Sequence, residues 1–139
     1  MELLIEGIMK SVRLLVGADP EVWGITWLSL KVSGAATCIA LVIGMPLGIG
    51  LATTRFPGRS IAVALVNTGM GLPPVVVGLF ISILLWRSGP LGVLNLIYTP
   101  AAMVIAQVVI AFPIVAGLTM AAFQTALKRK IHRQSGLMV

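Results

Sequence analysis

Charge is scarce in this chain of 139 residues: four acidic residues stand against ten lysines and arginines, and charged residues make up 10% of the sequence. An average soluble domain contains about 25% charged residues. Apolar residues make up 58% of the chain and its mean hydropathy is +1.07, which is more apolar side chain than a domain of this size can bury. These values exclude an ordinary soluble fold and indicate a membrane protein.

Residues that carry out chemistry are also scarce. Cys38 is the only cysteine and His132 the only histidine, so an intramolecular disulfide is excluded and no His/Cys/acid cluster has metal-ligand spacing. We interpret Cys38 as a packing residue and His132 as a solvated residue. No Walker A motif occurs, and no acidic pair lies in an apolar segment. The sequence predicts no catalytic residue, cofactor or metal site, and it disfavours half of a secondary transporter, which needs an ionisable coupling residue in the membrane.

Three apolar segments are long enough to span a bilayer, at residues 22–54, 61–86 and 101–123. The charge-free part of the first extends about 35 Å as a helix, against a hydrocarbon core of about 30 Å. Before the first and third segments, Asp19 and Thr99 each precede a proline, which is the N-cap and N1 pattern of a helix start. The sequence therefore predicts an all-α membrane protein with a transmembrane domain over residues 20–124.

Two charged segments flank this domain. Residues 1–19 mix leucines with Glu2, Glu6, Lys10 and Arg13, which predicts an amphipathic helix in the lipid interface. Residues 125–139 contain the run KRKIHRQ and form a predicted basic tail. If this tail and the RFPGR turn share one side, that side holds most of the bases, and the positive-inside rule predicts the N-terminus outside and the C-terminus in the cytoplasm of a multi-pass protein. Topology thus explains the basic charge without a nucleic-acid partner.

Small residues recur every four positions along the first predicted span. Residues four apart share one helix face, so another helix can approach closely there, although chance in a Gly/Ala-rich span is the alternative. We call this set the small-residue ridge: Ala36, Ala40, Gly44, Gly48 and Ala52.

The second predicted span is interrupted at Leu72, Pro73 and Pro74. A proline inside a regular helix costs about 3 kcal/mol, so the sequence predicts a break, and broken backbone at membrane depth must be covered by protein or line a cavity. Two uncharged polar residues, Asn67 and Gln107, lie in predicted spans. Each either bonds to a neighbouring helix or lines a pathway.

Four motifs in this order, LSLKVS (28–33), RFPGR (55–59), LPPVVVG (72–78) and RSGPLG (87–92), resemble the permease subunits of oxyanion ABC importers. The resemblance covers roughly residues 20–124 and is strongest to the tungstate permeases, while the molybdate permeases share LSLKVS and LPPVVVG. It implies a homodimeric pore in the inner membrane that is not itself an enzyme, a partner ATPase that hydrolyses ATP, and an extracytoplasmic oxyanion-binding protein. It also implies that the break at Leu72–Pro74 is a kink beside a gate, packed against the dimer mate or the small-residue ridge.

The resemblance further implies a coupling loop of pattern E-A-A-x-x-x-G after the third span, which docks the ATPase, and then more spans. Here the corresponding segment lacks the acid and the paired alanines; its candidate residues are Gln124, Lys128, Arg129, Lys130 and Gly136. We expect either a degenerate coupling helix or a truncated end, and therefore an incomplete copy of a permease. The alternative function is a small non-transporting membrane protein that recruits a partner helix through the small-residue ridge.

Overall fold

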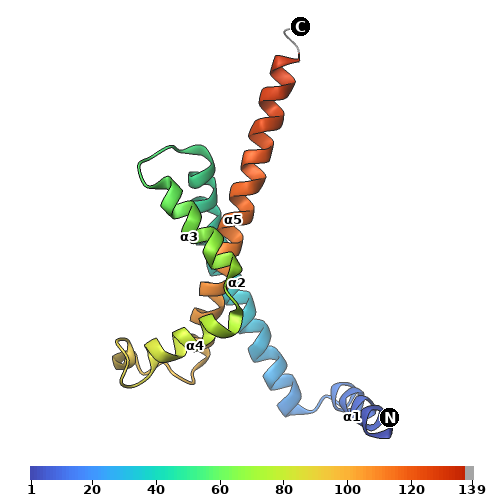
Figure 1. Ribbon diagram of the computed structural model, residues 1–139. Helices are drawn as coiled ribbons and strands as arrows, with labels where there is room; N and C mark the ends of the chain where they lie inside the picture. The colour runs from blue at the N-terminus through green and yellow to red at the C-terminus, as the bar shows by residue number, and fades with distance from the viewer. Residues whose placement is uncertain (137–139) are drawn as a thin grey trace.

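The computed structural model describes residues 1–136, which form helices and no strand; residues 137–139 of the predicted basic tail lie outside the described residues. The elements, drawn in Figure 1, are α1 (Glu2–Val16), α2 (Pro20–Thr53), α3 (Arg59–Gly71), α4 (Pro74–Leu85), the short 3-10 helix η1 (Gly92–Leu94) and α5 (Pro100–Ser135). Two of these helices, α2 and α5, are long and apolar enough to cross a membrane, and α3 with α4 makes a third span if the bent pair counts as one. The predicted all-α membrane class is confirmed.

Helix α2 begins and ends with specific hydrogen bonds. At its start the Asp19 carboxylate accepts a bond from the N–H of Glu21 at 3.0 Å, which satisfies one of the free amides of the first turn. At its end the Nε of Arg59 donates to the carbonyl of Leu51 at 2.8 Å, where a positive charge is favourable beside free carbonyls. Arg59 therefore ties the end of α2 to the start of α3 across the basic turn.

Helices α2 and α5 cross near the middle of the molecule and make the most extensive contact between any two elements (Figure 1). One core cluster, Leu51, Val66, Ala116 and Met120, joins α2, α3 and α5. A second cluster is built on Val77, Ile81 and Leu85 of α4 and is covered by apolar residues of α5. α5 is thus the central helix on which α2, α3 and α4 pack.

The second predicted span, residues 61–86, is not a single helix. α3 ends at Gly71 and α4 begins at Pro74, and the two axes are bent by 105°. Leu72 is extended, with φ −70° and ψ 130°, because a residue before proline is pushed out of the helical region, and Pro73 and Pro74 have no N–H to continue the ladder. The break predicted at Leu72–Pro74 is therefore present as a sharp bend between α3 and α4.

The third predicted span lies within α5, which does not stop near residue 123 but continues to Ser135. Lysine, arginine and glutamine are good helix formers, so the basic run ends the apolar segment without ending the helix. Gln124, Lys128, Arg129 and Lys130 therefore lie on the last turns of α5, and Gly136 directly follows them. In the part of the chain that is described, the predicted coupling segment is a continuation of α5 and not a separate short helix.

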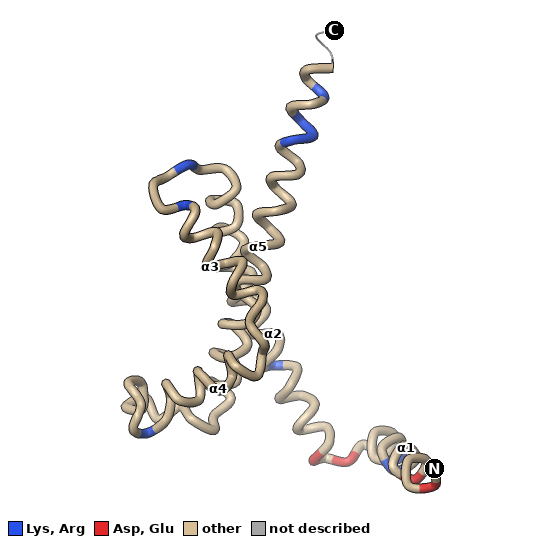
Figure 2. Tube along the Cα trace, in the orientation of Figure 1, with Lys and Arg blue, Asp and Glu red and all other residues tan. Residues whose placement is uncertain are grey.

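The charges separate along the length of the molecule. Figure 2 shows the bases of the 55–59 turn and of the end of α5 at one end, and the acidic residues on α1 and at the start of α2 at the other. The segment between α4 and α5 lies at the same end as α1 (Figures 1 and 2). The basic turn and the tail are thus on the same side, as the predicted topology requires.

Candidate functional site

The small-residue ridge is where α2 meets α5. A Cβ atom placed on Gly48 would lie 2.5 Å from the carbonyl oxygen of Ala116 and 2.7 Å from the Cβ of Thr119, distances that no real side chain occupies. A Cβ placed on Gly44 would lie 2.9 Å from the Cγ1 of Val115. The two glycines therefore let the backbones of α2 and α5 approach closely.

The alanines of the ridge follow the same face. Ala36 and Ala40 are buried, and Ala52 is partly buried against the cluster around Leu51. All five ridge residues thus lie on the inner side of α2, within the chain's own helix packing.

Helix α3 makes a second close approach to α5, near the middle of that helix. A Cβ placed on Gly69 would lie 2.8 Å from the Cβ of Pro113, and one on Gly117 would lie 2.5 Å from the sulfur of Met70. Pro113 is buried at this contact. Glycines thus mark the contacts that α5 makes on both sides, with α2 and with α3.

The predicted path residues lie on the surface of the single chain in the described structure. Asn67 on α3, Gln107 on α5, and Leu72, Pro73 and Pro74 at the break are all exposed on the single chain. Of these, Leu72 lines an apolar cavity of about 350 Å³ between α2, α3, α4 and α5. The other four do not line it, so a polar path is not enclosed by this chain alone.

The break leaves polar backbone groups without helical partners. At the start of α4 the carbonyl of Pro73 accepts bonds from the N–H groups of Val76 and Val77 at 3.0 and 3.3 Å. The last carbonyls of α3 have no such partners in the two prolines, which carry no N–H. Unpaired carbonyls are costly in lipid, so this exposed face of the chain is suited to contact protein or water.

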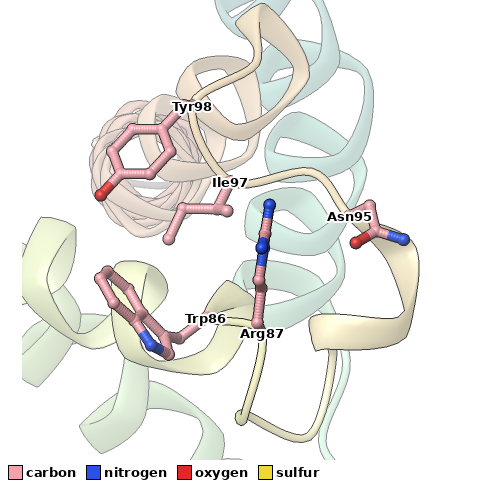
Figure 3. A pocket seen from close by; sticks show the side chains of 5 residues that line it. All are labelled: Trp86, Arg87, Asn95, Ile97 and Tyr98. Atoms are coloured by element: carbon pink, nitrogen blue, oxygen red, sulfur yellow. The ribbon is translucent and has the colours of Figure 1, made fainter.

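Sequence reasoning missed a pocket at the opposite end from the basic turn. It is a cavity of about 350 Å³ between the end of α4 and the start of α5, lined by Trp86, Arg87, Asn95, Ile97 and Tyr98. In Figure 3 the side chain of Arg87 extends toward Ile97, with Asn95 to one side and Trp86 and Tyr98 to the other. The motif RSGPLG, which builds part of this segment, was the available signal, but it supported only the resemblance.

The described residues thus define a multi-pass helical membrane protein with a broken span. Residues 1–136 contain no group of three or more His, Cys, Asp and Glu residues that could hold a metal ion.

Comparisons with known proteins identify its relatives. The chain is 43% identical over 119 residues to the tungstate uptake system permease protein TupB of Peptoclostridium acidaminophilum, covering 86% of this chain and 52% of that protein. It is 32% identical to TupB of Campylobacter jejuni, covering 85% of this chain and 49% of that protein, and 35% identical over 78 residues to the molybdenum permease ModB of Escherichia coli, covering 56% and 34%. No family model and no solved structure matches the chain.

These relatives confirm the family predicted from the sequence, the permease subunits of oxyanion ABC importers. The chain spans about half the length of the tungstate permeases that it matches.

Proposed function

We propose that this chain acts as the membrane-spanning permease component of an ABC importer for an oxyanion, with tungstate as the first candidate. The observation that carries the proposal is the 43% identity to a tungstate uptake permease over 119 residues. The chain forms the translocation path as a homodimer, an ATPase partner supplies the energy, and an extracytoplasmic binding protein delivers the anion.

The broken span supports a path at the face of the chain rather than inside it. Asn67, Gln107 and the break at Leu72–Pro74 are exposed on the single chain, and polar groups at membrane depth require protein or water around them. A second copy placed against this face encloses them. The anion then passes uncharged dipoles and helix ends beside a gate formed at the break.

The proposed ATPase contact is the end of α5. This segment carries Lys128, Arg129 and Lys130, is exposed, and extends beyond the other helices (Figure 1). Gln124 lies at its base and Gly136 at its end. The permease itself is not an enzyme in this proposal, because ATP hydrolysis belongs to the partner.

The competing interpretation, a small membrane protein that recruits a partner helix through the small-residue ridge, is less well supported. Gly44 and Gly48 already lie against α5. The ridge of α2 is therefore occupied within the chain.

We propose that the basic turn and tail face the cytoplasm and that α1 lies on the outer surface. Six of the ten bases lie in the basic turn and at the end of α5, whereas all four acids lie at the other end, and this distribution supports the orientation (Figure 2). Single cysteines at Ser60 and at Ser88, each in a Cys38→Ser background, test it in intact cells. A membrane-impermeant maleimide should label position 88 and leave position 60 unlabelled until the cells are opened; the reverse pattern contradicts the orientation.

Uptake measurements test the function itself. The gene is expressed in cells lacking their own tungstate and molybdate importers, together with the ATPase and the binding protein of its own genome, and cellular tungsten is measured by mass spectrometry. We expect accumulation that disappears when the ATPase carries an inactivating Walker A substitution. Unchanged background tungsten with all three proteins present in the membrane fraction would contradict the proposal.

A further inference from the structure

The pocket between α4 and α5 contains an unusual combination for this chain: a base, three polar or aromatic groups and no acid. We propose that this outer pocket binds the tetrahedral oxyanion at the mouth of the path, with the guanidinium of Arg87 as its main contact. The inference rests on the proposed transport function, and it places the first site at which the permease binds the anion in this pocket.

The local charge favours an anion. Arg87 is the only base between Arg59 and Lys128, and no acidic residue follows Glu21 in the sequence. Figure 2 shows the acids grouped on α1 and at the start of α2, away from the segment that carries Arg87. The guanidinium is therefore not neutralised by a carboxylate of the α4–α5 segment and is available to an anionic ligand.

The donors of the pocket match an oxyanion. A guanidinium presents five N–H donors in a planar fork that pairs with two oxygens at once. The indole of Trp86, the amide of Asn95 and the phenol of Tyr98 also line the cavity, and each can donate a hydrogen bond. All but Ile97 are exposed, so the pocket is open to an ion arriving from water.

The backbone that shapes the pocket is closely packed. A Cβ placed on Gly89 would lie 2.7 Å from the carbonyl oxygen of Leu84, and one on Gly92 would lie 2.5 Å from the carbonyl oxygen of Arg87. The N–H of Leu91 donates to the carbonyl of Leu84 at 3.0 Å. The two glycines of RSGPLG therefore hold the turn against the backbone of residues 84–87 and fix the position from which Arg87 extends.

The opposite wall is held by two residues in the left-handed region. Asn95 has φ 49° and Tyr98 has φ 64°, conformations that are uncommon for residues with side chains. The N–H of Asn95 donates to the carbonyl of Gly92 at 3.1 Å. The wall is therefore a defined turn, and it places Asn95 and Tyr98 on either side of Arg87 (Figure 3).

The outer pocket leads toward the break. A second cavity, of about 530 Å³, shares Trp86, Ile97 and Tyr98 with it and continues between α4 and α5 as far as Gly78 and Ala106. Gly78 lies one turn beyond Pro74 in α4. An ion bound at Arg87 is thus next to a cavity whose lining reaches to within one turn of the proposed gate.

Direct binding tests the pocket. The purified permease in nanodiscs, with Trp23→Phe and Trp27→Phe so that Trp86 is the only tryptophan, is titrated with sodium tungstate while its fluorescence is followed, and equilibrium dialysis measures bound tungsten independently. We expect saturable binding that weakens at least tenfold in Arg87→Gln and about threefold in Arg87→Lys, which keeps the charge and loses the fork. Lys10→Gln removes a base from α1 at the same end of the molecule and should leave binding unchanged. Equal affinities in the parent protein and Arg87→Gln overturn the proposal.

A second measurement separates this site from a docking point for the binding protein. Anion-free binding protein is added to the nanodiscs, and its affinity for the permease is compared between the parent and Arg87→Gln. The oxyanion site predicts equal affinities; a loss as large as that for tungstate shows instead that Arg87 pairs with an acidic residue of the binding protein, and overturns the proposal. Uptake measurements separate the oxyanion site from the transport function. Import with an unchanged KM in Arg87→Gln contradicts the oxyanion site alone. No import by the parent protein contradicts the proposed transport function.

Discussion

At the scale of single residues, glycines decide where the helices of this chain meet. Gly44 and Gly48 of α2 and Gly69 of α3 each lie where a Cβ would collide with α5, whereas Gly34 and Gly50 of α2 have open space around them. The four-residue spacing was readable from the sequence because it depends only on helix geometry. The sequence did not show which helix packs on the ridge, because the spacing of residues on α2 carries no information about α5.

Gly48→Ala and Gly50→Ala form a matched pair that tests this contact. The first adds a methyl group 2.5 Å from the carbonyl oxygen of Ala116, while the second adds one where nothing lies within 4 Å. Overpacking costs about 1–3 kcal/mol, so we expect Gly48→Ala to lower the free energy of unfolding by that amount in a detergent titration. Gly50→Ala should be neutral or raise it by up to about 1 kcal/mol, since alanine is the better helix former. Equal effects would show that α2 and α5 do not touch at Gly48.

At the scale of elements, the sequence predicted the position of the helix break but not the end of α5 or the angle between α3 and α4. The two prolines after Leu72 show where a helix must stop, because they remove N–H groups. The 105° bend also depends on how Val77, Ile81 and Leu85 of α4 pack against α5, a contact between distant segments that no local pattern encodes. The end of α5 lies beyond the third predicted span for a different reason. The apolar segment ends before the helix does, since Lys128–Lys130 are polar but favour a helix.

Replacing both prolines by alanine should allow α3 and α4 to join. Spin labels at positions 60 and 82, in a Cys38→Ser background, report the change by pulsed electron resonance. At 1.5 Å per residue the two sites are about 33 Å apart in a straight helix and about 20 Å apart when the axes are bent by 105°. We expect Pro73→Ala/Pro74→Ala to shift the distances toward the longer value, with insertion unchanged and gating of uptake altered.

Pro46→Ala is the control, because Pro46 lies inside the continuous helix α2. It should leave the distance between positions 60 and 82 as it is in the parent. If the double variant keeps the shorter distance as well, packing of α4 against α5 sets the bend and the prolines are only tolerated there.

At the scale of the whole molecule, the single chain exposes much more surface than a compact soluble protein of its mass. It exposes 10681 Å², whereas a compact soluble monomer of 14.6 kDa exposes about 6,900 Å². Lipid accounts for apolar side chains such as Val42 but not for the broken backbone at Leu72–Pro74, which needs protein or water. The all-α class and the position of the break were therefore predictable from composition and proline. The path through Asn67 and Gln107 stays a prediction, because both residues are exposed on the single chain.

Cysteine crosslinking tests whether a second copy covers that surface. Leu72→Cys and Val42→Cys are compared in a Cys38→Ser background; Leu72 is 45% exposed at the break and Val42 is 73% exposed on α2. If the homodimer closes over the break, Leu72→Cys should give a disulfide-linked dimer with a mild oxidant in native membranes, and Val42→Cys should stay monomeric despite its greater exposure. Dimers at both positions indicate random collision in the bilayer. A dimer at position 42 alone places the second copy on α2, and the proposed path must then lie elsewhere.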